Sequence, residues 1–254
     1  MADTITQPDA DERDCLMLWT MPRSGTHFVR TFLANYMIRL AGHWWAVVPE
    51  QHQIVAPRAP RKAGRPEGPR LDFGQFGFAD FGSEHATART LGEVRRAVIL
   101  VRNPLDFAVS HHFYAYCRDG RRPPLGEHLN ASLTLYVRGM RRIADYAARY
   151  PLVARIHHYE ALRSAPEDQF RAMLGFIGLP DDPAAFRFAL AVSAFELSNR
   201  VNGHVARAGV VGGWRDHLTP DQVAAVAMTL EAEGWRLDQF QLDAAGPPGR
   251  WPLA

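Results

Sequence analysis

The chain has 254 residues, of which 47% are hydrophobic and 22% are charged, and its formal net charge at pH 7 is +2. This composition is typical of a globular protein with one α/β domain, and so small a net charge does not favour nucleic acid or a membrane surface as a partner. Because Lys62 is the only lysine among 29 Lys and Arg residues, arginine must make almost every cationic contact with anions.

The cysteines and the ends of the chain bear on its environment. Cys15 and Cys117 form no disulfide or metal-binding pattern, which predicts reduced thiols in a cytoplasmic protein. Residues 1–13 are acidic and polar, unlike a signal peptide, and no apolar run is long enough to span a membrane. We expect one domain over residues 1–254, with 1–13 and 244–254 loosely held.

The first predicted elements are a strand, Cys15–Thr20, and a helix over residues 25–40, where apolar residues recur at intervals of three and four. Between them, a Pro-Arg-Ser-Gly-Thr turn presents backbone N–H groups and a cation beyond the end of the strand, which indicates an anion site. The alternative is a plain strand–helix turn with Ser24 as the cap. The turn is not a Walker A loop, because it lacks the lysine and the second glycine.

Residues 43–85 combine tryptophan and phenylalanine with many Pro, Gly and Arg residues. Such a composition predicts a surface lid over a binding site rather than a core element. The aromatic residues favour an apolar ligand there, whereas the arginines favour an anionic one, and the sequence leaves both open.

Further along the chain, strands are predicted at 97–101 and within 151–160, and helices at 104–116, 127–149, 164–178 (with a Ser164–Glu167 capping box), 183–191, 194–200 and 219–233. Strands that alternate with helices predict a mostly parallel sheet of four or five strands flanked by helices. Because parallel strands end at one edge, Arg23 and Arg102 should share that edge, which favours a ligand with more than one anionic group.

Three segments resemble motifs of the PAPS-dependent sulfotransferases. "MPRSGTHF" is similar to the 5′-phosphosulfate loop Y-P-K-S-G-T-T-W, "VRNPLDFAVS" to the 3′-phosphate segment, and "RAGVVGGWRDHLTPDQ" to the late loop R-K-G-x-x-G-D-W-K. They occur in the family's order, from about Leu16 to Val223. The resemblance implies a P-loop-like α/β fold and transfer of a sulfuryl group from PAPS to a hydroxyl, or less commonly an amine, of a small or medium acceptor, with release of PAP.

The resemblance also implies a set of site residues. The loop residues Arg23, Ser24, Gly25, Thr26 and His27 would hold the 5′ end of the nucleotide. Arg102, Ser110, Arg207, Ala208 and Gly209 would hold the 3′-phosphate, and Phe28, Tyr159, Ser193 and Phe195 would contact the adenosine. For the aromatic members, ordinary core packing is the alternative.

The chain departs from the family at several positions. Arg23 and Ala208 replace lysines, and Pro220 and Ala224 alter a short dimer motif, so the oligomeric state stays open. Arg23 can stabilise the leaving oxygen as a cation but cannot give up a proton at working pH.

Transfer to an alcohol also needs a general base. His85, in "GSEHAT", is the first candidate, and Glu84 and His52 are the alternatives. No metal is expected, since His111 and His112 are adjacent on a predicted helix and should not face one site.

Two other classes compete with this interpretation. A P-loop kinase would need a Walker lysine and a magnesium carboxylate, neither of which is evident. A nucleotide-binding protein without catalysis would be compatible with the changes at Arg23 and near His85.

Overall fold

The chain is represented by a computed structural model that describes residues 15–40, 42, 70–75, 94–116, 123–193 and 209–240. The predicted loose termini, most of the predicted lid and the predicted helix at 194–200 lie outside these ranges. The single-domain assignment over 1–254 therefore stays a prediction.

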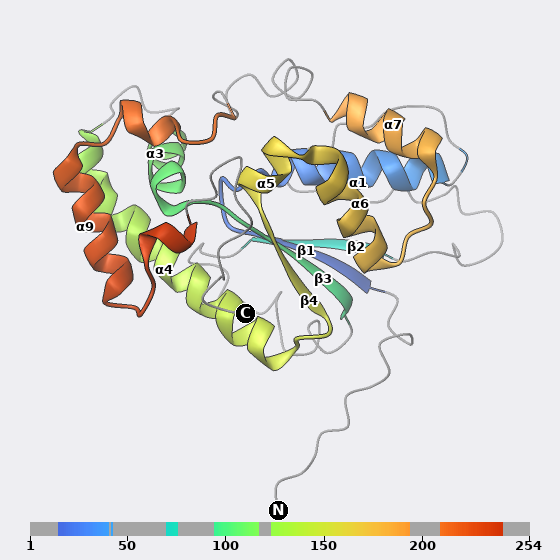
Figure 1. The fold of residues 1–254 in the computed structure, drawn as a ribbon, viewed down its shortest axis with the longest axis horizontal. Helices are drawn as coiled ribbons and strands as arrows, with labels where there is room; N and C mark the ends of the chain where they lie inside the picture. The colour runs from blue at the N-terminus through green and yellow to red at the C-terminus, as the bar shows by residue number, and fades with distance from the viewer. Residues whose placement is uncertain are drawn as a thin grey trace, which may run out of the picture.

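A four-stranded parallel sheet forms the centre of the fold, in the order β2-β1-β3-β4 (Figure 1). Its strands are β1 (Cys15–Thr20), β2 (Arg70–Gln75), β3 (Val94–Val101) and β4 (Ala154–His158). The predicted parallel α/β fold is confirmed. However, β2 lies within residues 43–85, where the sequence analysis assigned no strand.

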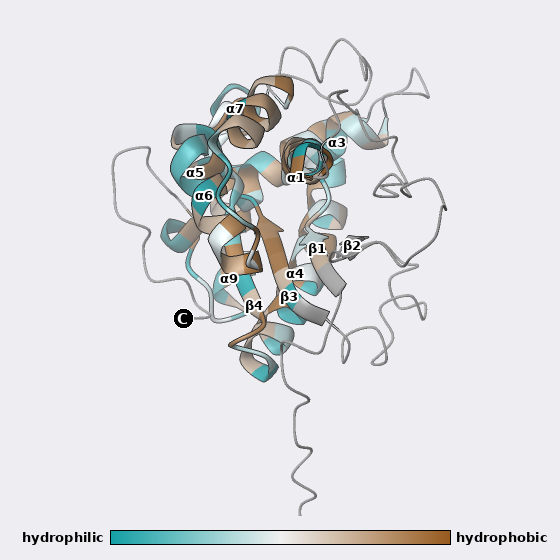
Figure 2. Cartoon of the chain, turned by 90° about the vertical axis from the view of Figure 1, so that its right-hand side faces the viewer, coloured by the Kyte–Doolittle hydropathy of each residue, from teal (hydrophilic) through white to brown (hydrophobic). Residues whose placement is uncertain are grey.

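The two faces of the sheet are buried by different helices, as the alternation of side chains along each strand requires. Leu18, Val98 and Leu100 pack on one face against α1 (Thr26–Leu40), α5 (Tyr159–Ser164), α6 (Pro166–Ile177) and α7 (Pro183–Val192). Met17, Trp19 and Ile99 pack on the other face against α3 (Pro104–Ala115), α4 (Leu125–Arg149), α9 (Pro220–Glu231) and the short 3₁₀ helix Leu237–Phe240. Figure 2 shows the ribbon of β3 in the hydrophobic colour of its scale.

Helix starts are fixed by capping side chains at several points. Asn103 caps α3, accepting from the N–H groups of Leu105 and Asp106, and Thr219 forms a capping box with Gln222 at α9. The predicted Ser164–Glu167 box is wrong, because Ser164 ends the short helix α5 and its hydroxyl donates to Ala161 O at 3.2 Å. Helix α6 instead begins at Pro166 without a side-chain cap.

The carboxyl ends of β1, β3 and β4 meet at one edge of the sheet, as parallel pairing requires. Met21–Gly25 follows β1, Arg102 and Asn103 follow β3, and Tyr159 follows β4. This edge holds the residues described next. Within the described ranges, no helix has the length and apolar character needed to cross a membrane.

Candidate functional site

The turn after β1 has a strained backbone and packs closely on one aromatic ring. Arg23 has a φ of 63°, and Gly25 has a φ of 90°. A Cβ atom on Gly25 would lie 2.6 Å from Cε2 of Tyr159, so the ring leaves room for glycine alone. Turns of this kind orient successive N–H groups to one side, and the first N–H groups of α1 add to them, which favours an anion.

Two hydroxyls of the turn are directed into the protein. Ser24 is fully buried and its hydroxyl donates to the carbonyl oxygens of Met21 and, at 3.1 Å, of Leu100. Thr26 Oγ1 donates to Thr20 Oγ1 at 2.9 Å. These bonds fix the turn to the ends of β1 and β3, and direct contact of either hydroxyl with a phosphate stays a prediction.

Arg23 is directed toward α3. Its Nε lies 3.3 Å from Ser110 Oγ, and its guanidinium carbon lies 4.7 Å from the centre of the Tyr114 ring. The structure thus brings together two predicted site residues from different motifs. Tyr114 was missed by the sequence analysis, although it lies one helical turn after Ser110 and so on the same face of α3.

Arg102 connects three parts of the site. Its Nη1 donates to Arg23 O at 2.9 Å, its Nη2 donates to Val210 O at 3.2 Å, and its guanidinium carbon lies 4.6 Å from the centre of the Tyr159 ring. The side chain is largely buried, and its Nε has no hydrogen-bond partner among the described residues. A buried cation with a donor to spare is suited to an anionic ligand.

The late loop is fixed at the same edge. Tyr159 donates its hydroxyl to Gly209 O at 2.9 Å. Asp106 accepts hydrogen bonds from Gly212 N at 2.7 Å and from Trp214 N at 3.1 Å. No local pattern in the sequence marked Asp106, because its partners lie more than one hundred positions away along the chain.

A buried polar layer supports this edge from behind. Tyr136 donates to Arg102 O at 2.8 Å, and Asn103 N donates to Glu160 Oε1 at 2.9 Å. Glu160 is 4% exposed, and its second oxygen has no hydrogen-bond partner among the described residues. Burial raises the pKa of Glu160 to about 7, against a smaller lowering effect of the Asn103 N–H and the Arg102 charge.

The raised pKa of Glu160 predicts a measurable pH dependence of stability. Unfolded Glu160 ionises near pH 4.5 whereas folded Glu160 does so near 7, so its contribution to stability is present below pH 4.5 and is lost as the pH rises to about 7. Relative to wild type, Glu160→Gln should therefore gain free energy of unfolding between pH 4.5 and 7.5, by an amount on the order of 3 kcal/mol.

Urea unfolding of both proteins at several pH values measures this difference. Burial lowers the pKa of His27, His111, His157 and His158 to about 4, which gives the opposite trend, but these residues are in both proteins and cancel in the comparison. A constant difference between the variants over this pH range would contradict the assignment.

Three histidines form a cluster beside the site. His111 Nδ1 lies 3.1 Å from His128 Nε2 and 3.0 Å from Ser132 Oγ, and the His112 ring lies 5.4 Å from that of His128. Both adjacent histidines thus contact His128, which the sequence analysis did not expect. Within the described part of the chain, no group of three or more His, Cys, Asp or Glu residues is arranged to hold a metal ion.

The remaining predicted residues are less closely joined to the edge. Phe28 packs edge-to-face on Phe170 at 5.1 Å between ring centres, and Ser193 is buried with its hydroxyl donating to Leu190 O at 3.0 Å. His27 lies in the first turn of α1 and is half-buried. The candidates His85, Glu84, His52, Phe195, Arg207 and Ala208 lie outside the described residues.

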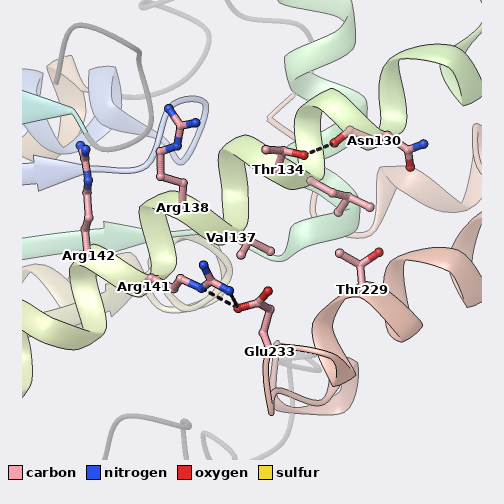
Figure 3. A pocket seen from close by; sticks show the side chains of 9 residues that line it. Asn130, Thr134, Val137, Arg138, Arg141, Arg142, Thr229 and Glu233 are labelled. Carbon is pink, nitrogen blue, oxygen red and sulfur yellow. Dashed lines mark hydrogen bonds and ion pairs between the residues drawn. The ribbon is translucent and has the colours of Figure 1, made fainter. Parts of the chain in front are cut away.

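A groove of about 550 Å³ lies elsewhere, between α4 and α9 (Figure 3). None of the predicted site residues lines it. In Figure 3, Arg141 reaches across it to Glu233, with an Nε–Oε2 distance of 2.6 Å. Because Arg141 is mostly exposed, this pair stabilises the fold little, and we regard the groove as a surface feature.

Comparison with known families identifies the class of protein. The sulfotransferase domain family matches residues 91–236, which is more than half of the chain and includes Arg102, Ser110, Tyr159 and Gly209. The chain therefore belongs to the sulfotransferase domain family, and its identification from sequence as an enzyme of this family is confirmed. No curated protein sequence matches the chain.

Solved structures with the same fold are distant in sequence. Mouse sulfotransferase SULT7A1, in complex with PAP, has 16% identity and a TM-score of 0.60, over 87% of this chain and 83% of that one. Retinol dehydratase has 13% identity and a TM-score of 0.61 in a complex with retinol and PAP, over 91% and 83% of the two chains. Its complex with androsterone and the inactive cofactor PAP has 14% identity and a TM-score of 0.58, over 91% and 82%.

Proposed function

We propose that the carboxyl edge of the sheet binds PAPS and transfers its sulfuryl group to a hydroxyl, or less commonly an amine, of a small or medium acceptor, releasing PAP. The observation that carries this proposal is the position of Arg102. Its guanidinium joins the β1 turn, the late loop and Tyr159 at one point, with a buried Nε still available to a ligand.

The nucleotide would lie across this edge. The β1 turn and the start of α1 would hold the 5′-phosphosulfate through backbone N–H groups and Arg23. Arg102 and Ser110 would hold the 3′-phosphate, with Arg207 and the Gly209 backbone from the late loop. Phe28, Tyr159, Ser193 and Phe195 would contact the adenosine. This assignment is supported by the contacts that already join Arg23, Ser110, Arg102 and Gly209 to one another or to Tyr159.

The transfer would be an in-line displacement. The acceptor oxygen forms a bond to sulfur while the bond between sulfur and the bridging phosphate oxygen breaks, and the acceptor proton passes to a general base. We assign the base to His85, with Glu84 and His52 as the alternatives. Arg23 would stabilise the negative charge that develops on the bridging oxygen, and its contacts with Ser110 and Tyr114 fix its direction.

A hydroxyl acceptor of modest size is supported by the structural relatives. Retinol dehydratase was solved with retinol and with androsterone, which are both apolar compounds that carry hydroxyl groups. In this chain the acceptor would lie under the predicted lid, residues 43–85. The arginines of that segment keep an anionic acceptor open as well.

Formation of PAP from PAPS with a panel of phenols, alcohols and amines tests the proposal. Arg23→Ala should lower kcat about 100- to 1,000-fold, because charge on the bridging oxygen develops in the transition state. KM for PAPS should rise by a smaller factor, about three- to tenfold, because Arg23 also helps to hold the 5′-phosphosulfate before transfer. Arg23→Lys keeps the cation, so its kcat should stay within about tenfold of the wild-type value.

A matched control is Arg39→Ala, which removes an arginine that also lies over a ring, Phe188, at the far end of α1. Its kcat should equal that of wild type. If Arg23→Ala raised KM and left kcat unchanged, Arg23 would serve binding alone. If PAP bound but no acceptor were sulfated, the chain would be a nucleotide-binding protein without catalysis.

A further inference from the structure

Three side chains, from α5, from the end of β3 and from α3, form hydrogen bonds with the described part of the late loop, residues 209–214. Tyr159 and Arg102, which the proposed function places at the nucleotide, donate to the carbonyl oxygens of Gly209 and Val210. Asp106, which that proposal does not use, accepts from the N–H groups of Gly212 and Trp214. Asp106 thus supplies two of the four hydrogen bonds that these side chains make to the segment.

Asp106 is a buried carboxylate in the first turn of α3, where the helix dipole favours a negative charge and the loop supplies two hydrogen-bond donors. The residue is 4% exposed, and its charge helps to raise the pKa of the neighbouring Glu160. A buried carboxylate near an anion site would also repel a phosphate, so direct contact with the nucleotide is disfavoured. Each of its oxygens instead accepts from one backbone N–H of the loop, and such charge-assisted bonds are stronger than neutral ones.

Helix α3 carries both Asp106, which anchors the late loop, and Ser110, which the proposed function places at the 3′-phosphate. Asp106 and Ser110 are four residues apart and so lie on one face of α3, and Arg102 directly precedes the capping residue Asn103. The Asn103 side chain accepts from Asp106 N at 3.4 Å and donates to Phe240 O at 3.0 Å, which fixes the start of the helix. The distance from the loop anchor to Ser110 is therefore set by one turn of a rigid element.

We propose that Asp106 is a positioning residue for the 3′-phosphate. By fixing Gly212 and Trp214 to the first turn of α3, it holds the Gly209 backbone toward the phosphate that Arg102 and Ser110 bind in the proposed function. This inference rests on the proposed function. Whereas the proposed function concerns residues that contact the nucleotide, this inference assigns nucleotide selectivity to a residue that does not contact it.

The test compares PAP with ADP, which carries the same number of phosphates but none at the 3′ position. Asp106→Ala should raise the Kd for PAP about 10- to 100-fold and change the Kd for ADP by less than about threefold. Asp106→Asn keeps one acceptor oxygen, so its Kd for PAP should lie between those of wild type and Asp106→Ala. With saturating PAPS, kcat should stay within about threefold of wild type while KM rises in parallel with the Kd for PAP.

Asp182→Ala is the matched control. Asp182 also accepts from two backbone N–H groups, those of Ala184 and Ala185, at the start of α7. Its substitution removes a carboxylate that accepts two backbone hydrogen bonds, but at another helix start. The ratio of the Kd for PAP to the Kd for ADP should therefore stay unchanged. A general loss of stability would affect both variants and both ligands.

Hydrogen–deuterium exchange provides a readout that does not depend on nucleotide binding. The amides of Gly212 and Trp214 should exchange faster in Asp106→Ala than in wild type or Asp182→Ala. Faster exchange without a selective loss of PAP binding would overturn the positioning role, as would unchanged exchange. If wild type itself bound ADP as well as PAP, the proposed function would fail, and this inference with it, whatever the exchange data show.

Discussion

Arg102→Ala is expected to weaken binding of PAP by about 150- to 5,000-fold. The substitution removes a buried cation and its hydrogen bonds to Arg23 O and Val210 O, together with its contact on the Tyr159 ring. Loss of a buried, hydrogen-bonded charge partner typically costs about 3–5 kcal/mol, which corresponds to that range of affinity. Titration calorimetry with PAP measures the change.

The matched control for this prediction is Arg155→Ala. Arg155 lies on β4, near its amino end, and its guanidinium carbon is 5.8 Å from the centre of the Phe176 ring. It is thus an arginine beside an aromatic ring at the other end of the sheet, and its removal should leave PAP affinity unchanged. A Kd for Arg102→Ala within threefold of wild type would show that Arg102 supports the loops without binding the ligand.

Gly25→Ala is expected to produce the largest local disruption of the turn. Its φ of 90° disfavours any residue with a Cβ, and that Cβ would overlap the Tyr159 ring, whose neighbours Arg102 and Gly209 are part of the site. We expect a loss of about 2–4 kcal/mol in the free energy of unfolding, as strain and overpacking combine, and no detectable PAP binding.

Gly42→Ala separates the cost of backbone strain from the cost of overlap with the Tyr159 ring. Gly42 has a φ of 81°, and, its two chain neighbours apart, no atom of the described residues lies within 4 Å of a Cβ placed there. Its substitution therefore carries the backbone strain without an overlap like that with the Tyr159 ring. Denaturant unfolding should give a cost of about 1 kcal/mol for Gly42→Ala. Equal costs for the two variants would contradict the close packing of Gly25 on Tyr159.

Much of the site edge was predictable from local patterns. The apolar runs before Pro22 and Arg102 identified two central strands, and the Asn103-Pro104 pair identified the start of α3. Since strands that alternate with helices form parallel sheets, the edge shared by Arg23 and Arg102 followed from the order of elements alone. In the structure Arg23 then contacts both Ser110 and Arg102.

Other features depend on partners that are distant along the chain and have no local pattern. An aspartate in the first turn of a helix is ordinarily explained by the helix dipole, so nothing in the sequence marked Asp106 as the anchor of the late loop. Strand β2 has a glycine in a short segment flanked by Pro- and Gly-rich sequence, and pairing with β1 outweighs that weak propensity. Ser164 matched a capping pattern, but α5 extends to it from the end of β4.

Thermal unfolding of the wild-type protein with PAP, ADP and 5′-AMP tests directly whether this edge of the sheet is a PAPS site. At one hundred times its Kd, a ligand adds about 2.7 kcal/mol to the free energy of unfolding, which for a domain of this size raises Tm by about 5–10 °C. If the site binds the 3′-phosphate specifically, PAP will raise Tm by about 5–10 °C at concentrations where ADP and 5′-AMP have little effect. If ADP stabilises the protein as well as PAP does, or no nucleotide shifts Tm, the assignment of this edge as a PAPS site is wrong.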